Sequence, residues 1–142
     1  MRFARAGRPF ACVAVLLIGG WIAPAPVMSH FAEPRYYAHD LFATREECAA
    51  SRLYTCEQTI IFCPNRSAQY SVSDIIHYSR YDLRDDLVTV RPRANEEVPG
   101  IVRFTLSADG ESLKHGETGT VWTRRPKMDD LARSACQRMQ VM

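Results

Sequence analysis

Between residues 67 and 125, apolar and polar side chains alternate in short runs. The clearest runs are residues 80–90, 102–113 and 119–124, and turns containing Asp and Gly separate them. A period of two residues turns one face of a strand toward a core and the other toward water. With about seven strands and short connections, we expect a mainly β fold: an antiparallel meander that closes into a small barrel, since closure removes exposed edges.

Short helices are expected on both sides of this meander. Thr44 and Glu47 fit a capping box, which predicts a helix through about residue 52 that precedes a β-rich run at residues 55–63. After Pro126 the apolar residues fall at helical spacing, with acids near the start and a base near the end. We therefore expect an amphipathic C-terminal helix packed on the barrel. Residues 30–40 are aromatic-rich, and the sequence leaves open whether they dock on it.

Residues 1–29 have the layout of a secretory signal peptide. Three arginines precede an apolar segment at residues 11–23 that is short for a membrane span, and a Pro-broken segment follows. We expect cleavage before His30, which leaves one domain over residues 30–142; a retained N-terminal membrane anchor is the alternative. The mature protein is then expected to be periplasmic or secreted by a bacterium and not integral to the membrane.

Removing this segment also changes the charge balance. The chain has 18 basic and 16 acidic residues, and three arginines but no acid lie in the signal segment, so 15 basic and 16 acidic residues remain. A nearly neutral domain lacks the excess of basic residues that general nucleic-acid binding requires. We therefore expect no nucleic-acid partner. We also expect the protein to be a monomer.

Four cysteines follow the signal segment: Cys48, Cys56, Cys63 and Cys136. An even number behind a secretion signal predicts two disulfides, and no Cys-x-x-Cys pair or His at zinc-ligand spacing supports a metal site. In one continuous strand Cys56 and Cys63 would lie about 23 Å apart, beyond the roughly 7 Å that a disulfide spans between Cα atoms. Two pairings remain: Cys48–Cys56 with Cys63–Cys136, which we favour, and Cys48–Cys63 with Cys56–Cys136.

No catalytic constellation can be assembled from the sequence. None of the four histidines pairs with another at i, i+4, and the chain has no Gly-x-Ser-x-Gly elbow or phosphate-binding glycine loop. With two disulfides, residues 30–142 also contain no free cysteine for nucleophilic work. We expect no catalytic residue, no metal and no cofactor, and therefore a protein that is not an enzyme.

Three arginines form the one group of residues that suggests a binding site. If Val88 and Val90 face the core, Arg91 and Arg93 face outward, and the same alternation places Arg103 outward on the next strand. Guanidinium groups side by side repel one another and favour a carboxylate, phosphate or sulfate partner.

Other charged residues could either enlarge this basic group or neutralise it. Arg80 or Arg124 would lie near the three arginines and enlarge the basic group. The alternative is that Asp82, Glu96 and Glu97 neutralise it and leave an ordinary solvated surface.

Four segments carry a family resemblance: residues 80–83, 86–90, 102–110 and 119–124. Their order resembles the strands of small lipocalin-like, calycin-type barrels secreted by bacteria, over about residues 67–125. The resemblance implies an antiparallel barrel, and members of such groups are often of unknown function. The chain is shorter than true lipocalins and lacks their Gly-x-Trp motif near the mature start.

Together these features predict a non-enzymatic secreted or periplasmic binding module. Its ligand would be a small apolar molecule in the barrel or an anionic envelope partner at Arg91, Arg93 and Arg103. The alternative is an inhibitor or accessory protein that acts on an envelope or host enzyme. An interior cavity would favour the small ligand, whereas a filled interior with exposed arginines would favour a protein partner.

Overall fold

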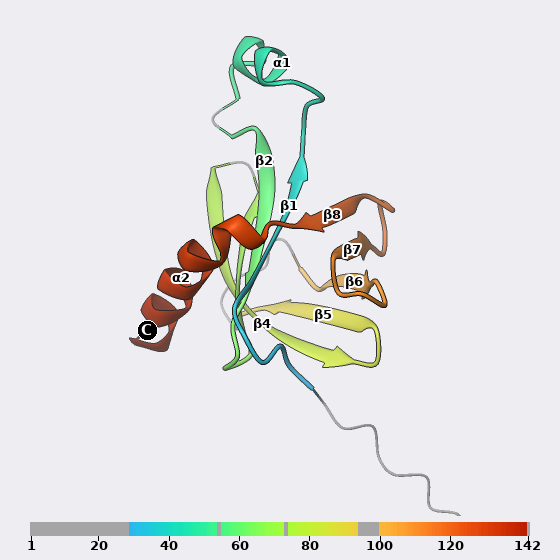
Figure 1. Cartoon of the computed structure of the whole chain (residues 1–142), viewed down its shortest axis with the longest axis vertical. Helices are drawn as coiled ribbons and strands as arrows, with labels where there is room; N and C mark the ends of the chain where they lie inside the picture. Colours follow the sequence, from blue (N-terminus) through green and yellow to red (C-terminus); the bar gives the residue numbers. More distant parts are fainter. Residues whose placement is uncertain (1–28, 54, 73, 94–99, 142) are drawn as a thin grey trace, which may run out of the picture.

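The computed structural model describes residues 29–53, 55–72, 74–93 and 100–141, and it shows a closed barrel of eight antiparallel strands (Figure 1). Each strand pairs with the next in the chain, and β8 returns to β1. The strands are β1 (Arg35–Asp40), β2 (Glu57–Phe62), β3 (Ser67–Val72), β4 (Ile75–Arg84), β5 (Leu87–Pro92), β6 (Val102–Leu106), β7 (Ser112–His115) and β8 (Val121–Arg124). The helices are α1 (Arg45–Ala50), η1 (Pro126–Met128) and α2 (Asp129–Val141). The predicted mainly β meander that closes into a barrel is confirmed.

The strand that closes the barrel is β1, which the sequence had left undecided. It pairs with β2 along its whole length and with β8 at Tyr37 and Ala38. Three successive residues, Tyr36, Tyr37 and Ala38, are buried, because one side of β1 faces the interior and the other lies under α2. A strand buried on both faces shows no alternation. The expectation of about seven strands was therefore one strand short.

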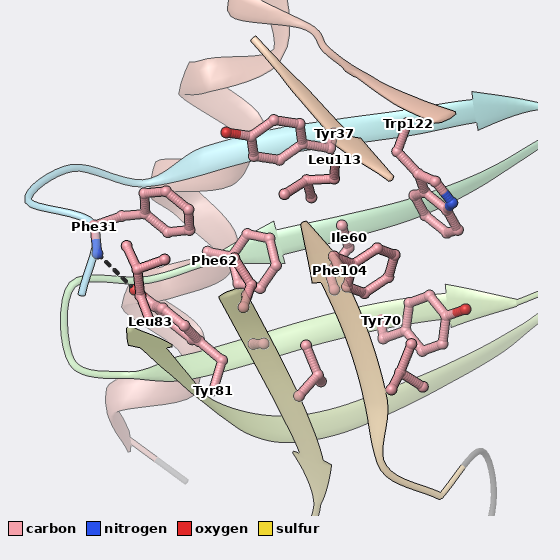
Figure 2. Close-up of a cluster of buried hydrophobic side chains, with 14 residues drawn as sticks. Phe31, Tyr37, Ile60, Phe62, Tyr70, Tyr81, Leu83, Phe104, Leu113 and Trp122 are labelled. Carbon is pink, nitrogen blue, oxygen red and sulfur yellow. Dashed lines mark hydrogen bonds between the residues drawn. The ribbon is translucent and has the colours of Figure 1, made fainter. Parts of the chain in front are cut away.

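Large side chains fill the barrel interior (Figure 2). Every strand contributes to this cluster, which contains Phe31, Tyr37, Ile60, Phe62, Ala68, Tyr70, Tyr81, Leu83, Val88, Val90, Val102, Phe104, Leu113 and Trp122. Phe31, which precedes β1, lies with its ring centre 5.2 Å from that of Phe62 and 5.7 Å from that of Tyr81. Its backbone N–H donates to the Tyr81 hydroxyl at 3.0 Å, and this hydroxyl donates to the Cys63 carbonyl at 2.9 Å. Phe31 thus packs into the barrel with its backbone polar group satisfied.

Helix α2 lies on the outside of β1 and β2 (Figure 1). Beneath it lies a group of buried outward residues that we call the covered face: Tyr36, Ala38, Ile61 and Cys63. Ala132, Ala135 and Met139 of α2 are buried against them. The expected amphipathic C-terminal helix is confirmed, and it continues from η1, which begins at Pro126.

Two disulfides join the cysteines in the pairing that we favoured. Cys63 binds Cys136 and ties β2 to α2, and Cys48 binds Cys56, each with a Cα–Cα distance of 5.5 Å. The alternative pairing is not formed. The cap of α1 also follows the prediction, since the Thr44 hydroxyl accepts the Glu47 N–H at 3.1 Å.

The N-terminal prediction falls almost entirely outside the described residues. Of the expected signal peptide, residues 1–29, only Ser29 is described, and it forms an antiparallel bridge with Leu83. Two backbone hydrogen bonds join these residues, at 2.9 and 3.2 Å. The signal peptide and its cleavage stay predictions.

Candidate anion-binding face

The outward side of β4 to β7 forms a second outer surface, which we call the open face. Val88, Val90 and Phe104 point into the interior cluster, so Arg91 and Arg103 point outward and are exposed. Helix α2 packs on β1, β2 and β3 instead (Figure 1), and its C-terminal part borders the open face at Met139 and Gln140. The outward direction that alternation predicted for these two arginines agrees with their exposure.

Cross-strand register brings two arginines directly opposite each other on this face. Arg80 of β4 is the antiparallel partner of Arg91 of β5, and Thr89 is the partner of Arg103 of β6. Directly opposed side chains have Cβ atoms about 5 Å apart, and like charges at that separation are destabilising. Asp82 relieves part of this repulsion by forming an ion pair with Arg91. The neutralising role considered for Asp82 therefore applies to Arg91, whereas Glu96 and Glu97 lie outside the described residues.

The first hollow of the open face has a volume of about 680 Å³. Three arginines line it, Arg80, Arg91 and Arg93, and the Arg93 guanidinium lies 5.7 Å from the ring centre of Tyr78. Its other lining residues are Asn65, Ser67, Pro92, Met139 and Gln140. The hollow therefore combines positive charge with the polar side chains of the β2–β3 connection and the end of α2.

The second hollow is smaller, about 220 Å³. Its lining residues are Asp82, Arg84, Leu87, Thr89, Arg91 and Arg103. Arg91 lines both hollows, whereas Arg93 lines only the first and Arg103 only the second. The three predicted arginines thus share one face but not one hollow.

The open face contains basic residues beyond the three predicted arginines, and the sequence indicated only some of them. Arg80 lies beside the predicted group as considered, and Arg84 was missed although it has the same parity as Arg80. Counting described acids only, no carboxylate ion-pairs with Arg80, Arg84, Arg93 or Arg103. Positive charge that is not neutralised within the described chain therefore extends beyond the three predicted arginines.

Arg124, the other neighbour considered, lies in a different environment. It pairs with Asp129 at 2.8 Å and with Glu111 at 3.8 Å, and it lines a hollow of about 500 Å³ beside Arg125 and Tyr36. Arg125 pairs with Asp40 at 2.7 Å. Burial, and then the nearby Glu57 carboxylate, raise the pKa of Tyr36 to about 12, so its hydroxyl stays protonated at neutral pH. Because carboxylates already pair with its arginines, this hollow is a weaker anion site than the open face.

The histidines of β1 and β7 make local structural contacts. His115 Nδ1 accepts the backbone N–H groups of Glu117 and Thr118 at 3.2 Å, which stabilises the β7–β8 turn, and His39 Nδ1 lies 3.2 Å from the Val121 carbonyl. Over the part of the chain that the structure describes, no group of three or more His, Cys, Asp or Glu residues is placed to hold a metal ion. Among the described helices, none is long and apolar enough to cross a bilayer.

Comparison with known proteins adds no relative. No family model, no curated protein and no solved structure matches the chain. The lipocalin-like resemblance therefore stays a prediction, and the function has to be argued from the open face itself.

Proposed function

We propose that this protein is a non-enzymatic binding module that recognises an anionic group at the first hollow of the open face. One observation carries the proposal: Arg80 and Arg91 are direct cross-strand partners, and Arg93 lines the same hollow. Their mutual repulsion is relieved only in part by Asp82. A carboxylate, sulfate or phosphate placed between the guanidinium groups would remove the remaining repulsion and accept their N–H donors in charge-assisted hydrogen bonds.

The filled interior supports a ligand on the outside of the barrel rather than a small apolar molecule within it. Tyr37, Tyr81 and Trp122 are at most 1% exposed, and their rings lie in the interior cluster (Figure 2). An apolar ligand in the barrel would have to displace close-packed aromatic side chains, whose burial contributes strongly to stability.

We place this module in the periplasm or outside the cell. Two disulfides support this location, because such bonds form and persist in oxidising compartments. The signal-like pattern of residues 1–29 and the resemblance to secreted lipocalin-like barrels support it independently of the disulfides.

Isothermal titration calorimetry with inorganic sulfate and phosphate tests the proposal. We expect Arg93→Ser to weaken binding about tenfold, because it removes a charged donor, and Asp82→Asn to strengthen it, because it releases Arg91. Arg133→Ser is the control, since Arg133 lies on α2 and pairs with Asp130 at 3.0 Å. The proposal fails if neither anion binds, or if the control weakens binding as much as Arg93→Ser does.

An inhibitor or accessory protein of an enzyme is the second candidate. Ile75 and Ile76, at the start of β4, are 57% and 50% exposed, and exposed apolar side chains of this size are suited to a protein partner. The titration above separates the two functions, because a partner held by these residues requires no response to sulfate.

A further inference from the structure

We infer that the ligand of the open face is an acidic polysaccharide that crosses both hollows, and not a compact anion held in the first one. This inference rests on the proposed function and names its ligand class. The basic residues concerned come from four consecutive strands or directly follow them: Arg80 and Arg84 of β4, Arg91 of β5 with Arg93 after it, Arg103 of β6 and Lys114 of β7. All six are exposed.

The positions of these charges form a continuous path. Arg91 lines both hollows and therefore joins them. From the second hollow, register leads across the sheet from Arg84 to Leu87, Thr105 and Lys114, which are successive cross-strand partners. Neighbouring strands lie about 4.8 Å apart, and outward positions on one strand recur about every 6.7 Å. Six charges at such spacings extend well beyond the reach of one sulfate or phosphate group.

Within the four strands, one described acidic residue lies on this path. On the outward side of β4 to β7, within the ranges that the structure covers, Asp82 is the acid, and it pairs with Arg91. The other described acids lie in the connections: Asp85 and Asp86 in the β4–β5 turn beside Arg84, Asp109 and Glu111 between β6 and β7, and Glu117 in the β7–β8 turn. The outward side of these strands therefore carries a net positive charge, which is complementary to a polyanion.

The shape of the face argues against two other polyanionic partners. Because eight strands complete the barrel, the outward direction rotates by about 135° around the barrel axis between β4 and β7. A flat bilayer would therefore contact only part of the path. An extended acidic peptide that adds a strand to a sheet needs an exposed edge, and the closed barrel offers none for this mode of binding. A flexible chain that follows a convex surface meets neither obstacle.

The side chains on the path favour a sugar polymer over a nucleic acid. Single-stranded nucleic acids are held by aromatic side chains on which bases stack. Among the outward residues described on these four strands, the aromatic one is Tyr78, which is partly buried and lies beneath the Arg93 guanidinium. Thr105, which is exposed, instead offers a hydroxyl group beside Lys114, and this group suits the hydroxyl groups of a polysaccharide.

Calorimetric titration with oligosaccharides of increasing length tests this inference. The probes are polygalacturonate fragments, which carry carboxylates, and heparin fragments, which carry sulfates. We expect affinity to rise with length until a fragment reaches from Arg93 to Lys114 and then to level off. For the longest fragments, Arg93→Ser, Arg103→Ser and Lys114→Ser each weaken binding about fivefold, whereas the shortest respond to Arg93→Ser alone. Arg133→Ser again serves as the control, and circular dichroism checks that every variant is folded.

The possible contrary results are distinct. If affinity does not depend on length, and Arg103→Ser and Lys114→Ser have no effect while Arg93→Ser does, the ligand is a compact anion; the proposed function stands and this inference is overturned. Tighter binding to phosphatidylglycerol vesicles or to single-stranded DNA than to the longest oligosaccharides overturns it as well. If neither the oligosaccharides nor inorganic sulfate or phosphate bind, the proposed function itself fails.

Discussion

The covered face and the open face belong to one barrel and follow the same alternation, yet they differ in what lies over them. On β1 and β2 the outward residues Tyr36, Ala38 and Ile61 are buried under α2. On β4 to β6 the outward residues include Arg80, Arg91 and Arg103, which are exposed to solvent. The inward residues of both regions enter the same interior cluster. The comparison shows that inward side chains build the barrel, whereas outward side chains decide which partner each side accepts.

The two faces also differ in their energetics. Fully burying a large aliphatic side chain such as Ile61 contributes roughly 1.5–3 kcal/mol, and Cys63–Cys136 holds α2 in place over it. An exposed ion pair such as Arg91–Asp82 contributes only about 0–1 kcal/mol. The covered face therefore serves stability, and the open face can carry charges for binding at little cost to it.

Placing a charge on each face in turn should give the largest contrast. We expect Ile61→Arg to lower the free energy of unfolding by on the order of 5 kcal/mol, because the guanidinium would be buried under α2 without a partner. Thr105→Arg, at an exposed outward position of β6 opposite Lys114, should lower it by less than about 1 kcal/mol, because the like charges repel only in solvent. Urea unfolding measures both, and similar losses would remove the distinction between the faces.

The two disulfides provide the next test, because only one of them belongs to the covered face. Cys63–Cys136 spans 73 residues of sequence and Cys48–Cys56 spans 8. Loop-closure entropy predicts a loss of about 4 kcal/mol for Cys63→Ala with Cys136→Ala, and about 2–3 kcal/mol for Cys48→Ala with Cys56→Ala. Urea unfolding of the two double variants measures these losses. A larger loss from the Cys48–Cys56 pair would contradict the structural role assigned to the covered face.

The ionisation of Tyr36 at alkaline pH should give the smallest effect of a single group. Burial and the Glu57 carboxylate raise the pKa of Tyr36, on the covered face, to about 12 from 10.0. Because the folded protein holds this proton more tightly, the stabilisation is complete below pH 10 and is lost as the pH rises toward 12, to a total of about 2 kcal/mol. Tyr81 of the interior has a pKa raised to the same value by burial, so it adds to this loss.

Unfolding experiments across this pH range measure the effect, with Tyr36→Phe as the matched variant. The variant should lose less stability between pH 10 and 12 than the original protein does, because it has no phenol to ionise at this position. An identical pH dependence in both proteins would show that Tyr36 ionises as easily when folded as when unfolded.

The sequence predicted much of the open face but not its hollows. Alternation from Val88 and Val90 is a local property, so it placed Arg91 and Arg103 outward correctly. Which arginines share a hollow depends instead on register and on α2, whose Met139 borders the first hollow beside Arg80. Neither can be derived from spacing along one strand.

By itself the sequence determined those features that depend on residues close together in the chain. These are the strand alternation, the cap of α1, the C-terminal helix and the exclusion of a Cys56–Cys63 disulfide. The tertiary structure decided how β1 closes the barrel, how Phe31 packs against Tyr81, and which side α2 covers. These features join residues far apart in the chain. Their free energy comes from burying both partners together, which no pattern within either segment can express.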